Sequence, residues 1–461
     1  MIFSYFLLRV LDKLLARTTA ENKAFYKRFL TLAFPVVMAE LLSALVNIMD
    51  TVMITRGMGI YEVTGAALAN QFFFIYVVVF WGAAASCGVF IGQYHGKGDT
   101  KNIQKTVGLG LTCSLAIMVF FFVPALFFPQ AVIRIYSPDP QVIYLGAQFL
   151  RTLAWCFPFV AVTFTRNVCM RNTGQTKIPM VTTSTALILN FLGNLILIFG
   201  FNAPLSVVAM GTVFARIVEL CLQEYLIRKY KVPVVGTLKQ YLTYDRAFVR
   251  EVFKVGIFII MATSTWSIGT SVYNIAYGLI GPQAQGAVKI STSLMQLFQV
   301  FGTSLGIATQ IMMTNALGSG DKQKAVTYAK KCFNTAVGVS LVMGVLLVIF
   351  APWIVGVFGA EGEVRHYVMM LTYLYSVGLV LRTGNFIQYN GILRSGGDTK
   401  FHFFADLVAV WCIGIPMAFI GAVWLQWPVY GVVLLVHADE IYKFFLGMWR
   451  VKSHKWVKKL V

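Results

Sequence analysis

Long apolar stretches alternate with short polar connections along the whole chain. Each stretch of about 20 apolar residues is long enough to cross the hydrocarbon core of a membrane as a helix. The pattern predicts an all-α polytopic membrane protein with twelve transmembrane helices. The expected spans are 31–56, 66–94, 105–128, 143–169, 178–200, 205–228, 250–280, 285–316, 326–350, 366–392, 400–424 and 428–449.

Basic residues occur on alternate sides of these spans. Connections that follow even-numbered spans are rich in Lys and Arg, whereas connections that follow odd-numbered spans are nearly free of them. The positive-inside rule therefore places both termini in the cytoplasm. Residues 1–28 have an apolar start followed by Arg9, Lys13 and Arg17, which favours an amphipathic helix on the cytoplasmic surface rather than a cleaved signal peptide.

Composition supports this picture and excludes other classes. Of the 461 residues, 58% are hydrophobic and only 12% are charged, too few to cover the surface of a soluble protein of this size. The net charge of +20 reflects topology, so we expect no nucleic-acid partner. The seven cysteines are scattered through apolar stretches without a Cys-x-x-Cys pair and are interpreted as reduced core residues, with no metal or disulfide role.

Two polar motifs recur at nearly one offset and indicate an internal duplication. Gly96-Lys-Gly-Asp99 recurs 222 residues later as Gly318-Ser-Gly-Asp321, and Arg171–Lys177 recurs 223 residues later as Arg394–Lys400. Two six-helix lobes with the same orientation follow, related by a pseudo-two-fold axis along the membrane normal, with the binding cavity between them. The expected segments are an N-terminal segment 1–28, an N-lobe 29–228, a linker 229–249, a C-lobe 250–449 and a basic tail 450–461.

The repeated Gly-x-Gly-Asp motif superficially resembles a phosphate-binding loop. It lacks the lysine and serine spacing of that loop, and no strand precedes it. We therefore interpret it as a tight turn that ends a helix, with glycine at a positive φ.

Asp50 is the residue that carries the functional interpretation. It follows more than a dozen largely uncharged residues within the first span, and a carboxylate at membrane depth is costly enough to be a functional candidate by default. A rise of 1.5 Å per residue puts Asp50, Asn194 and Thr212 roughly 9–12 Å below the outer surface, with Asn190 about one turn deeper. These oxygens suit Na⁺, and they equally suit a hydrogen-bonded, protonatable Asp50. The alternative is that the amides and the hydroxyl only join helices.

Two further residues on the first span are accessory candidates for cation binding, namely Asn47 and Glu40. Glu40 precedes Asp50 by ten residues, close to the same helix face but about 15 Å deeper. The repeat offset pairs Asp50 with Val272, so the coupling chemistry should be confined to the N-lobe.

The other intramembrane charges look structural. Neutralising pairs are expected between Arg216 and Glu219 and, at the mirrored positions of the last span, between His437 and Glu440. Lys443 also lies within reach of Glu440. Arg382 on the tenth span could pair with Asp406 on the eleventh.

Several motifs in order give the chain a family resemblance. Val46-Asn47-x-x-Asp50-Thr, Asn190-x-x-x-Asn194 and Leu393-Arg-Ser-Gly-Gly-Asp-Thr-Lys400 resemble the multidrug and toxic compound extrusion (MATE) family, and Trp411-x-x-Gly-Ile-Pro416 and Trp449–Trp456 resemble its members in Gram-positive bacteria. The resemblance extends from about residue 25 to the end of the chain.

The resemblance implies a monomeric antiporter of the bacterial plasma membrane. Such a protein exports cationic or amphiphilic organic compounds in exchange for Na⁺ or H⁺ and needs no other cofactor. The family's first-span acid maps onto Asp50, its fifth-span pair onto Asn190 and Asn194, and its sixth-span Ala-Thr onto Gly211-Thr212. Acids that some members carry on spans seven and ten are replaced by Trp266 and about Thr383, which argues against a C-lobe cation site of that type.

Two other functions are weighed against this one. A lipid-linked oligosaccharide flippase of the same superfamily would line its cavity with several Arg and Lys, whereas the spans here offer mainly Arg382. A membrane enzyme is disfavoured because the spans contain no His-x-x-x-His, Ser-His-Asp or paired-carboxylate constellation. Neither the choice between Na⁺ and H⁺ nor the substrate follows from the residues.

Overall fold

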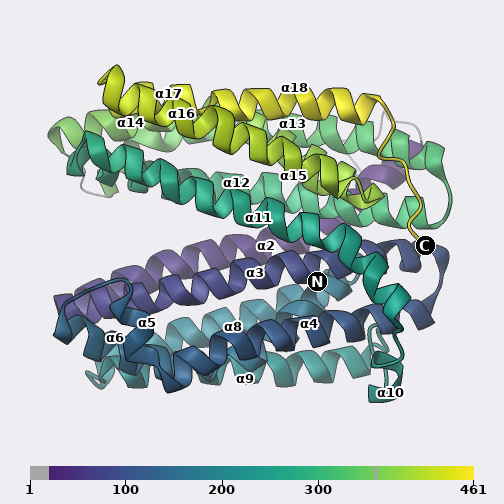
Figure 1. The fold of residues 1–461 in the computed structure, drawn as a ribbon, viewed down its shortest axis with the longest axis horizontal. Helices are drawn as coiled ribbons and strands as arrows, with labels where there is room; N and C mark the ends of the chain where they lie inside the picture. Colours follow the sequence, from purple (N-terminus) through teal and green to yellow (C-terminus); the bar gives the residue numbers. More distant parts are fainter. Residues whose placement is uncertain (1–19, 358–360) are drawn as a thin grey trace.

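The chain forms two helical lobes that meet at one end and diverge toward the other (Figure 1). The computed structural model describes residues 20–357 and 361–461. Most of the expected amphipathic segment 1–28 therefore lies outside the described residues. Residues 20–28 belong instead to the first long helix, which begins earlier than expected because Phe25 and Phe29 are buried against the second lobe.

The N-lobe consists of six helical rods. A bend of 51° divides the fourth rod, and a π-helical turn over Ile196–Gly200 extends the fifth. The rods are α2 (Ala20–Gly57), α3 (Ile60–Lys97), α4 (Thr100–Phe127), α6 with α7 (Pro140–Ala154 and Phe157–Asn172), α8 (Lys177–Leu195) and α9 (Leu205–Lys229), with the short α5 (Pro129–Arg134) between the third and the fourth.

The C-lobe repeats this arrangement after the short α10 (Leu238–Tyr241). Its tenth and eleventh rods contain π-helical turns, over Ile387–Leu393, Val408–Gly414 and Ile420–Trp424. The rods are α11 (Arg246–Ile280), α12 (Pro282–Gly318), α13 (Lys322–Val357), α14 (Gly362–Phe386) continued to Gly396, α15 (Thr399–Leu407) with α16 (Ile415–Phe419), and α17 (Val429–Val436) with α18 (Ala438–Lys452).

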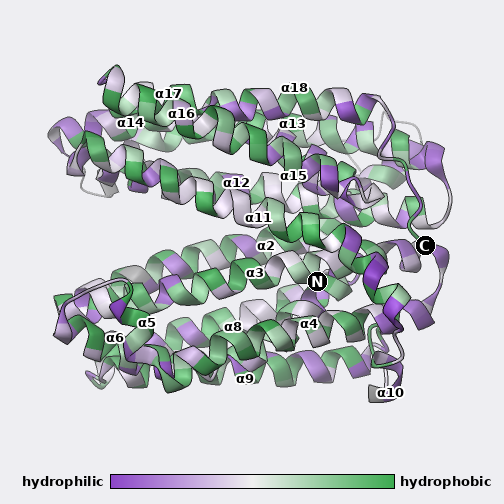
Figure 2. Ribbon diagram, in the orientation of Figure 1, coloured by the Kyte–Doolittle hydropathy of each residue, from purple (hydrophilic) through white to green (hydrophobic). Residues whose placement is uncertain are grey.

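Twelve rods confirm the predicted fold class. Among the described helices, nine are long and apolar enough to cross a membrane, and the bent pair of α6 and α7 makes ten. The remaining two rods, α12 and α17 with α18, lie alongside the others within the C-lobe (Figure 1). Figure 2 shows hydrophobic residues along the rods and hydrophilic residues gathered toward their ends, as expected for a bundle that crosses a bilayer.

The repeated glycine motifs are helix-ending turns, as predicted. Gly98 and Gly320 have φ values of 80° and 84°, in the left-handed region that glycine adopts without strain. Each is followed by an aspartate that accepts a backbone N–H of the next helix, from Asn102 to Asp99 at 3.1 Å and from Lys324 to Asp321 at 2.9 Å. The two lobes thus share local geometry as well as sequence.

The lobes are joined at the end where the basic connections and the C-terminus lie, called here the basic end (Figure 1). Gln93 on α3 donates its Nε2 hydrogen to the carbonyl oxygen of Ser395 at 2.8 Å, and its Oε1 accepts the backbone N–H of Leu460 at 2.8 Å. Glycine permits the close approach, because a Cβ on Gly318 would overlap the Gln93 carbonyl and a Cβ on Gly92 would overlap the Thr314 side chain. We call this contact the seam.

Candidate functional site

Asp50 lies near the end of α2 that points away from the basic end. Seven residues, or roughly 10 Å of helix, separate it from the last residue of α2, Gly57. Asn194 on α8 donates its Nδ2 hydrogen to Asp50 Oδ1 at 3.2 Å. The same amide lies 3.4 Å from Asn190 Oδ1, one turn earlier on α8. The carboxylate is therefore held against the fifth rod.

The hydrogen bonds continue to the sixth rod. Asn190 donates its Nδ2 hydrogen to Thr212 Oγ1 on α9 at 2.8 Å. Asp50, Asn194, Asn190 and Thr212 thus form one continuous chain across α2, α8 and α9, which confirms that the helices bring these residues together. Their role in ion coupling stays a prediction.

The surroundings of the cluster leave the carboxylate without a neutralising charge. Asn194 is 4% exposed, and its Oδ1 atom is buried without a hydrogen-bond partner in the described part of the chain. A Cβ on Gly211 would lie 3.5 Å from that oxygen, so the glycine leaves space beside it. No Lys, Arg or His of residues 20–357 and 361–461 lies within ion-pair distance of Asp50. An unpaired amide oxygen in the cluster that holds the carboxylate fits a Na⁺ ion, and a proton on Asp50 would neutralise the site equally well.

The two accessory candidates differ in their surroundings. Asn47 lies one turn before Asp50 on α2, with an exposed side chain. Glu40 pairs instead with Arg171 of α7, with Oε1 and Nη1 3.3 Å apart. The charge of Glu40 is thus already matched by a residue from a different rod, and its role as a second cation contact stays a prediction.

The expected pair on α9 is present. Arg216 Nη1 lies 2.7 Å from Glu219 Oε2, and Thr183 of α8 donates to Glu219 Oε1 at 3.0 Å. Glu219 is nearly inaccessible, so the ion pair and the hydroxyl together satisfy a buried carboxylate.

Two of the expected C-lobe pairs are wrong in their partners, whereas Lys443 lies 3.5 Å from Glu440 as expected. Arg382 pairs with Glu440 at 3.6 Å rather than with Asp406, which contacts His402 at 3.0 Å and Lys443 at 3.7 Å. His437 does not pair with Glu440, because its Nδ1 bonds the carbonyl oxygen of Val433 at 2.7 Å where α17 ends. His437 lies at the break between α17 and α18.

One buried acid of the C-lobe was missed. Asp439 is 4% exposed, and Tyr273 of α11 donates its hydroxyl hydrogen to Asp439 Oδ2 at 2.9 Å. The adjacent acids Asp439 and Glu440 in an apolar span were the available signal. Only Glu440 occupies the position that mirrors Glu219 of the first half.

Replacement of Lys443 by Met should destabilise the protein strongly. Lys443 is 6% exposed and lies between Glu440 at 3.5 Å and Asp406 at 3.7 Å, so its loss leaves two buried carboxylates short of a cation. Removing one partner of such a pair costs about 3–5 kcal/mol. The thermal unfolding midpoint of the detergent-solubilised protein measures the effect. Arg228→Met is the matched control, because the Arg228 side chain is 74% exposed and its pair with Glu224 should contribute about 1 kcal/mol or less.

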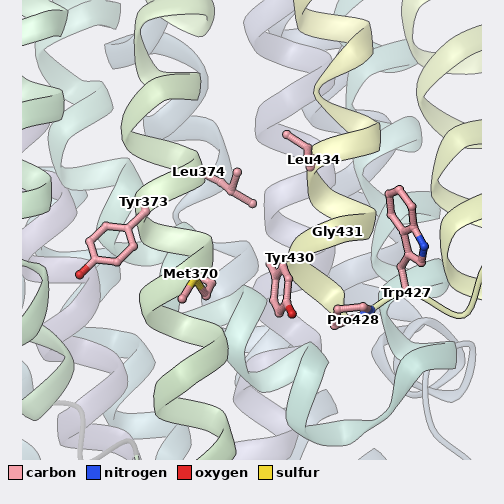
Figure 3. Close-up of a pocket in the computed structure, with 8 residues that line it drawn as sticks. All are labelled: Met370, Tyr373, Leu374, Trp427, Pro428, Tyr430, Gly431 and Leu434. Carbon is pink, nitrogen blue, oxygen red and sulfur yellow. The ribbon is translucent and has the colours of Figure 1, made fainter.

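One pocket of the described residues lies away from the Asp50 cluster, in the C-lobe. It is an almost wholly apolar groove of about 470 Å³ between α14 and α17 (Figure 3). Its lining residues are Met370, Tyr373, Leu374, Trp427, Pro428, Tyr430, Gly431 and Leu434. It shares no residue with the Asp50 cluster and is not part of that site.

Comparisons with known proteins connect the fold and the cluster to a family. The MatE family model matches residues 35–196 and 258–420, two segments that begin 223 residues apart, as the internal repeat requires. The chain is 25% identical over 458 residues to the uncharacterized transporter YisQ of Bacillus subtilis (strain 168), covering 96% of this chain and 98% of YisQ. It is 24% identical over 446 residues to the probable multidrug resistance protein YoeA of the same organism, covering 91% and 93%.

Solved structures share the architecture. A crystal structure of MATE in complex with MaD3S superposes with a TM-score of 0.84 at 17% identity, covering 93% of this chain and 96% of that chain. A MOP superfamily transporter from Pyrococcus furiosus gives the same TM-score, identity and coverage. At this identity the likeness concerns the fold, a two-lobe bundle of twelve membrane helices.

Proposed function

The chain belongs to the MatE family, and on that premise we propose that it exports cationic and amphiphilic organic compounds in exchange for Na⁺ or H⁺. Members of the family are membrane transporters and not enzymes. Among the similar proteins, YoeA and the MdtK of Yersinia enterocolitica are named for multidrug resistance, the latter at 23% identity over 403 residues.

The observation that carries the proposal is the Asp50 carboxylate, bonded to Asn194 and without a cationic side chain beside it. An unpaired charge at membrane depth is costly, so the site favours binding of a small cation or a proton. A cationic substrate would compete for the same negative charge. Competition between ion and substrate for one carboxylate is the thermodynamic basis of exchange, because each ligand lowers the apparent affinity for the other.

Orientation supports the direction of transport. We take the basic end as cytoplasmic under the positive-inside rule, which places both ends of the described chain on that side of the plasma membrane. The seam then closes the cytoplasmic side, and Asp50 lies toward the outer side, where it can take up an external ion. One chain supplies both lobes, so a monomer suffices.

Efflux from proteoliposomes under separately imposed gradients tests the proposal. The purified protein is reconstituted with a fluorescent aromatic cation inside, and either a Na⁺ gradient or a pH gradient is imposed at zero membrane potential. Export driven by one of the two gradients supports the proposal and identifies the ion. Absence of export under both, with protein of verified folding and insertion, overturns it.

A further inference from the structure

The C-lobe holds a second buried acid that has no part in the Asp50 cluster. We propose that Asp439 is a proton-binding site, occupied by a proton while its neighbours Glu440 and Asp406 stay ionised. The proposal goes beyond the exporter function and does not depend on it, because it concerns equilibrium binding of a proton in the resting protein.

The position of Asp439 is closely packed. It lies in the first turn of α18, and Tyr273 of α11 donates to its Oδ2 atom at 2.9 Å. A Cβ on Gly414 would overlap the Tyr273 hydroxyl and would lie 3.2 Å from Asp439 Oδ2, so this glycine lets three rods converge on the acid. The packing leaves the carboxyl 4% exposed and far from bulk solvation.

Charges in this part of the C-lobe do not balance. Three carboxylates (Asp406, Asp439 and Glu440) share two permanent cations, Arg382 and Lys443. The group therefore carries one excess negative charge when every acid is ionised and His402 is neutral. A buried uncompensated charge is costly, and binding of one proton removes it.

The contacts assign this proton to Asp439. Glu440 lies near both cations and accepts an Asn385 Nδ2 hydrogen at 2.7 Å, while Asp406 contacts Lys443 and His402. Asp439 has a single described partner, the neutral Tyr273 hydroxyl, and no Lys, Arg or His of the described residues lies within ion-pair distance of it. The least stabilised carboxylate is the one that holds the proton.

Other titratable groups surround the site on every rod that packs against it. The tyrosines remain neutral at physiological pH, which leaves His402 and His437 as the alternative carriers of the proton. His437 bonds a carbonyl oxygen through Nδ1, and His402 contacts Asp406. These groups include Tyr273 and Tyr277 on α11, Tyr375 and Arg382 on α14, Tyr389 on the following π-helical turn, His402 and Asp406 on α15, and His437, Glu440, Tyr442 and Lys443 around α18.

Infrared titration of the full chain in lipid nanodiscs, without any substrate, tests the assignment. The carbonyl-stretch band of a protonated carboxylic acid is followed against pH in an Asp50→Asn background, which silences the N-lobe acid. The band should be present near neutral pH and should be lost when Asp439→Asn is added. Asp245→Asn is the matched control, because Asp245 caps α11 at the surface and asparagine caps equally well.

A second variant keeps Asp439 in place, so the proposal can still be tested if Asp439→Asn misfolds. Tyr273→Phe removes the only described donor to the carboxylate, so the protonated form should persist to a pH about one to two units higher. A neutral-pH band that survives Asp439→Asn, or one that does not respond to Tyr273→Phe, overturns the proposal. So does an imidazolium signal lost with His402→Gln at the same pH. Because transport is not measured, failure here leaves the exporter proposal standing.

Discussion

Replacement of Asp50 by Asn should abolish ion-driven export while leaving the protein folded. The amide is isosteric, and its oxygen can still accept the Asn194 Nδ2 hydrogen that holds α2 against α8. Only the negative charge is lost, and with it the attraction for Na⁺, a proton or a cationic substrate. Interactions with a charged group contribute up to about 3 kcal/mol, so the efflux rate should fall roughly 100-fold.

The measurement is the initial rate of dye efflux from proteoliposomes at equal protein content. Asp139→Asn is the control, since Asp139 caps α6 by accepting the backbone N–H of Gln141 at 2.8 Å and asparagine can take over that bond. Asp50→Glu, which restores the charge, should recover part of the rate. Coupled export by Asp50→Asn at the wild-type rate would show that the charge is not needed.

Alanine at Gly92 and Gly318 should force the lobes apart at the seam. The new Cβ atoms would overlap Thr314 and the Gln93 carbonyl, so the contact can form only with a backbone shift. Overpacking of this kind costs about 1–3 kcal/mol, which changes a conformational equilibrium about 5- to 150-fold. The state closed at the basic end should lose population in favour of one opened there.

Distances between spin labels across the basic end report this change. Lys101→Cys at the start of α4 and Lys322→Cys at the start of α13 provide exposed sites in opposite lobes once the native cysteines are replaced. Gly338→Ala is the control, because a Cβ at Gly338 meets open space. An unchanged distance distribution in the double alanine variant would mean that the seam is not the contact that holds the lobes together.

The limits of the spans and the grouping of the Asp50 cluster could be predicted from the sequence, because each depends on a single physical quantity. Apolar length determines where a helix enters and leaves the bilayer, and most of the expected span limits agree with the helices to within a few residues. Depth along a helix follows from the rise per residue, which is why Asp50, Asn194, Asn190 and Thr212 were grouped correctly.

The partners of Arg382 and His437 were predicted wrongly because the depth of a residue along its helix does not show toward which neighbouring helix its side chain points. Counting along two helices places Arg382 and Asp406 at similar depths, but it does not show that Arg382 faces Glu440 on the last rod while Asp406 faces His402 and Lys443. The last rod is broken at His437, whose ring bonds the carbonyl oxygen of Val433 rather than Glu440. Glu40 shows a related limit, since counting along α2 could not reveal that Arg171 approaches from another rod.

The last residues of the chain also provide a way to measure the opening of the molecule. Trp456 is fully buried beside Gly396 of the C-lobe, whereas the amide hydrogen of Leu460 is bonded to Gln93 of the N-lobe. The lobes cannot separate at the seam without exposing that hydrogen to water. Opening of the seam therefore sets a lower limit on the rate of deuterium exchange at this amide, so slow exchange at one backbone position gives an upper limit for the fraction of molecules that are open.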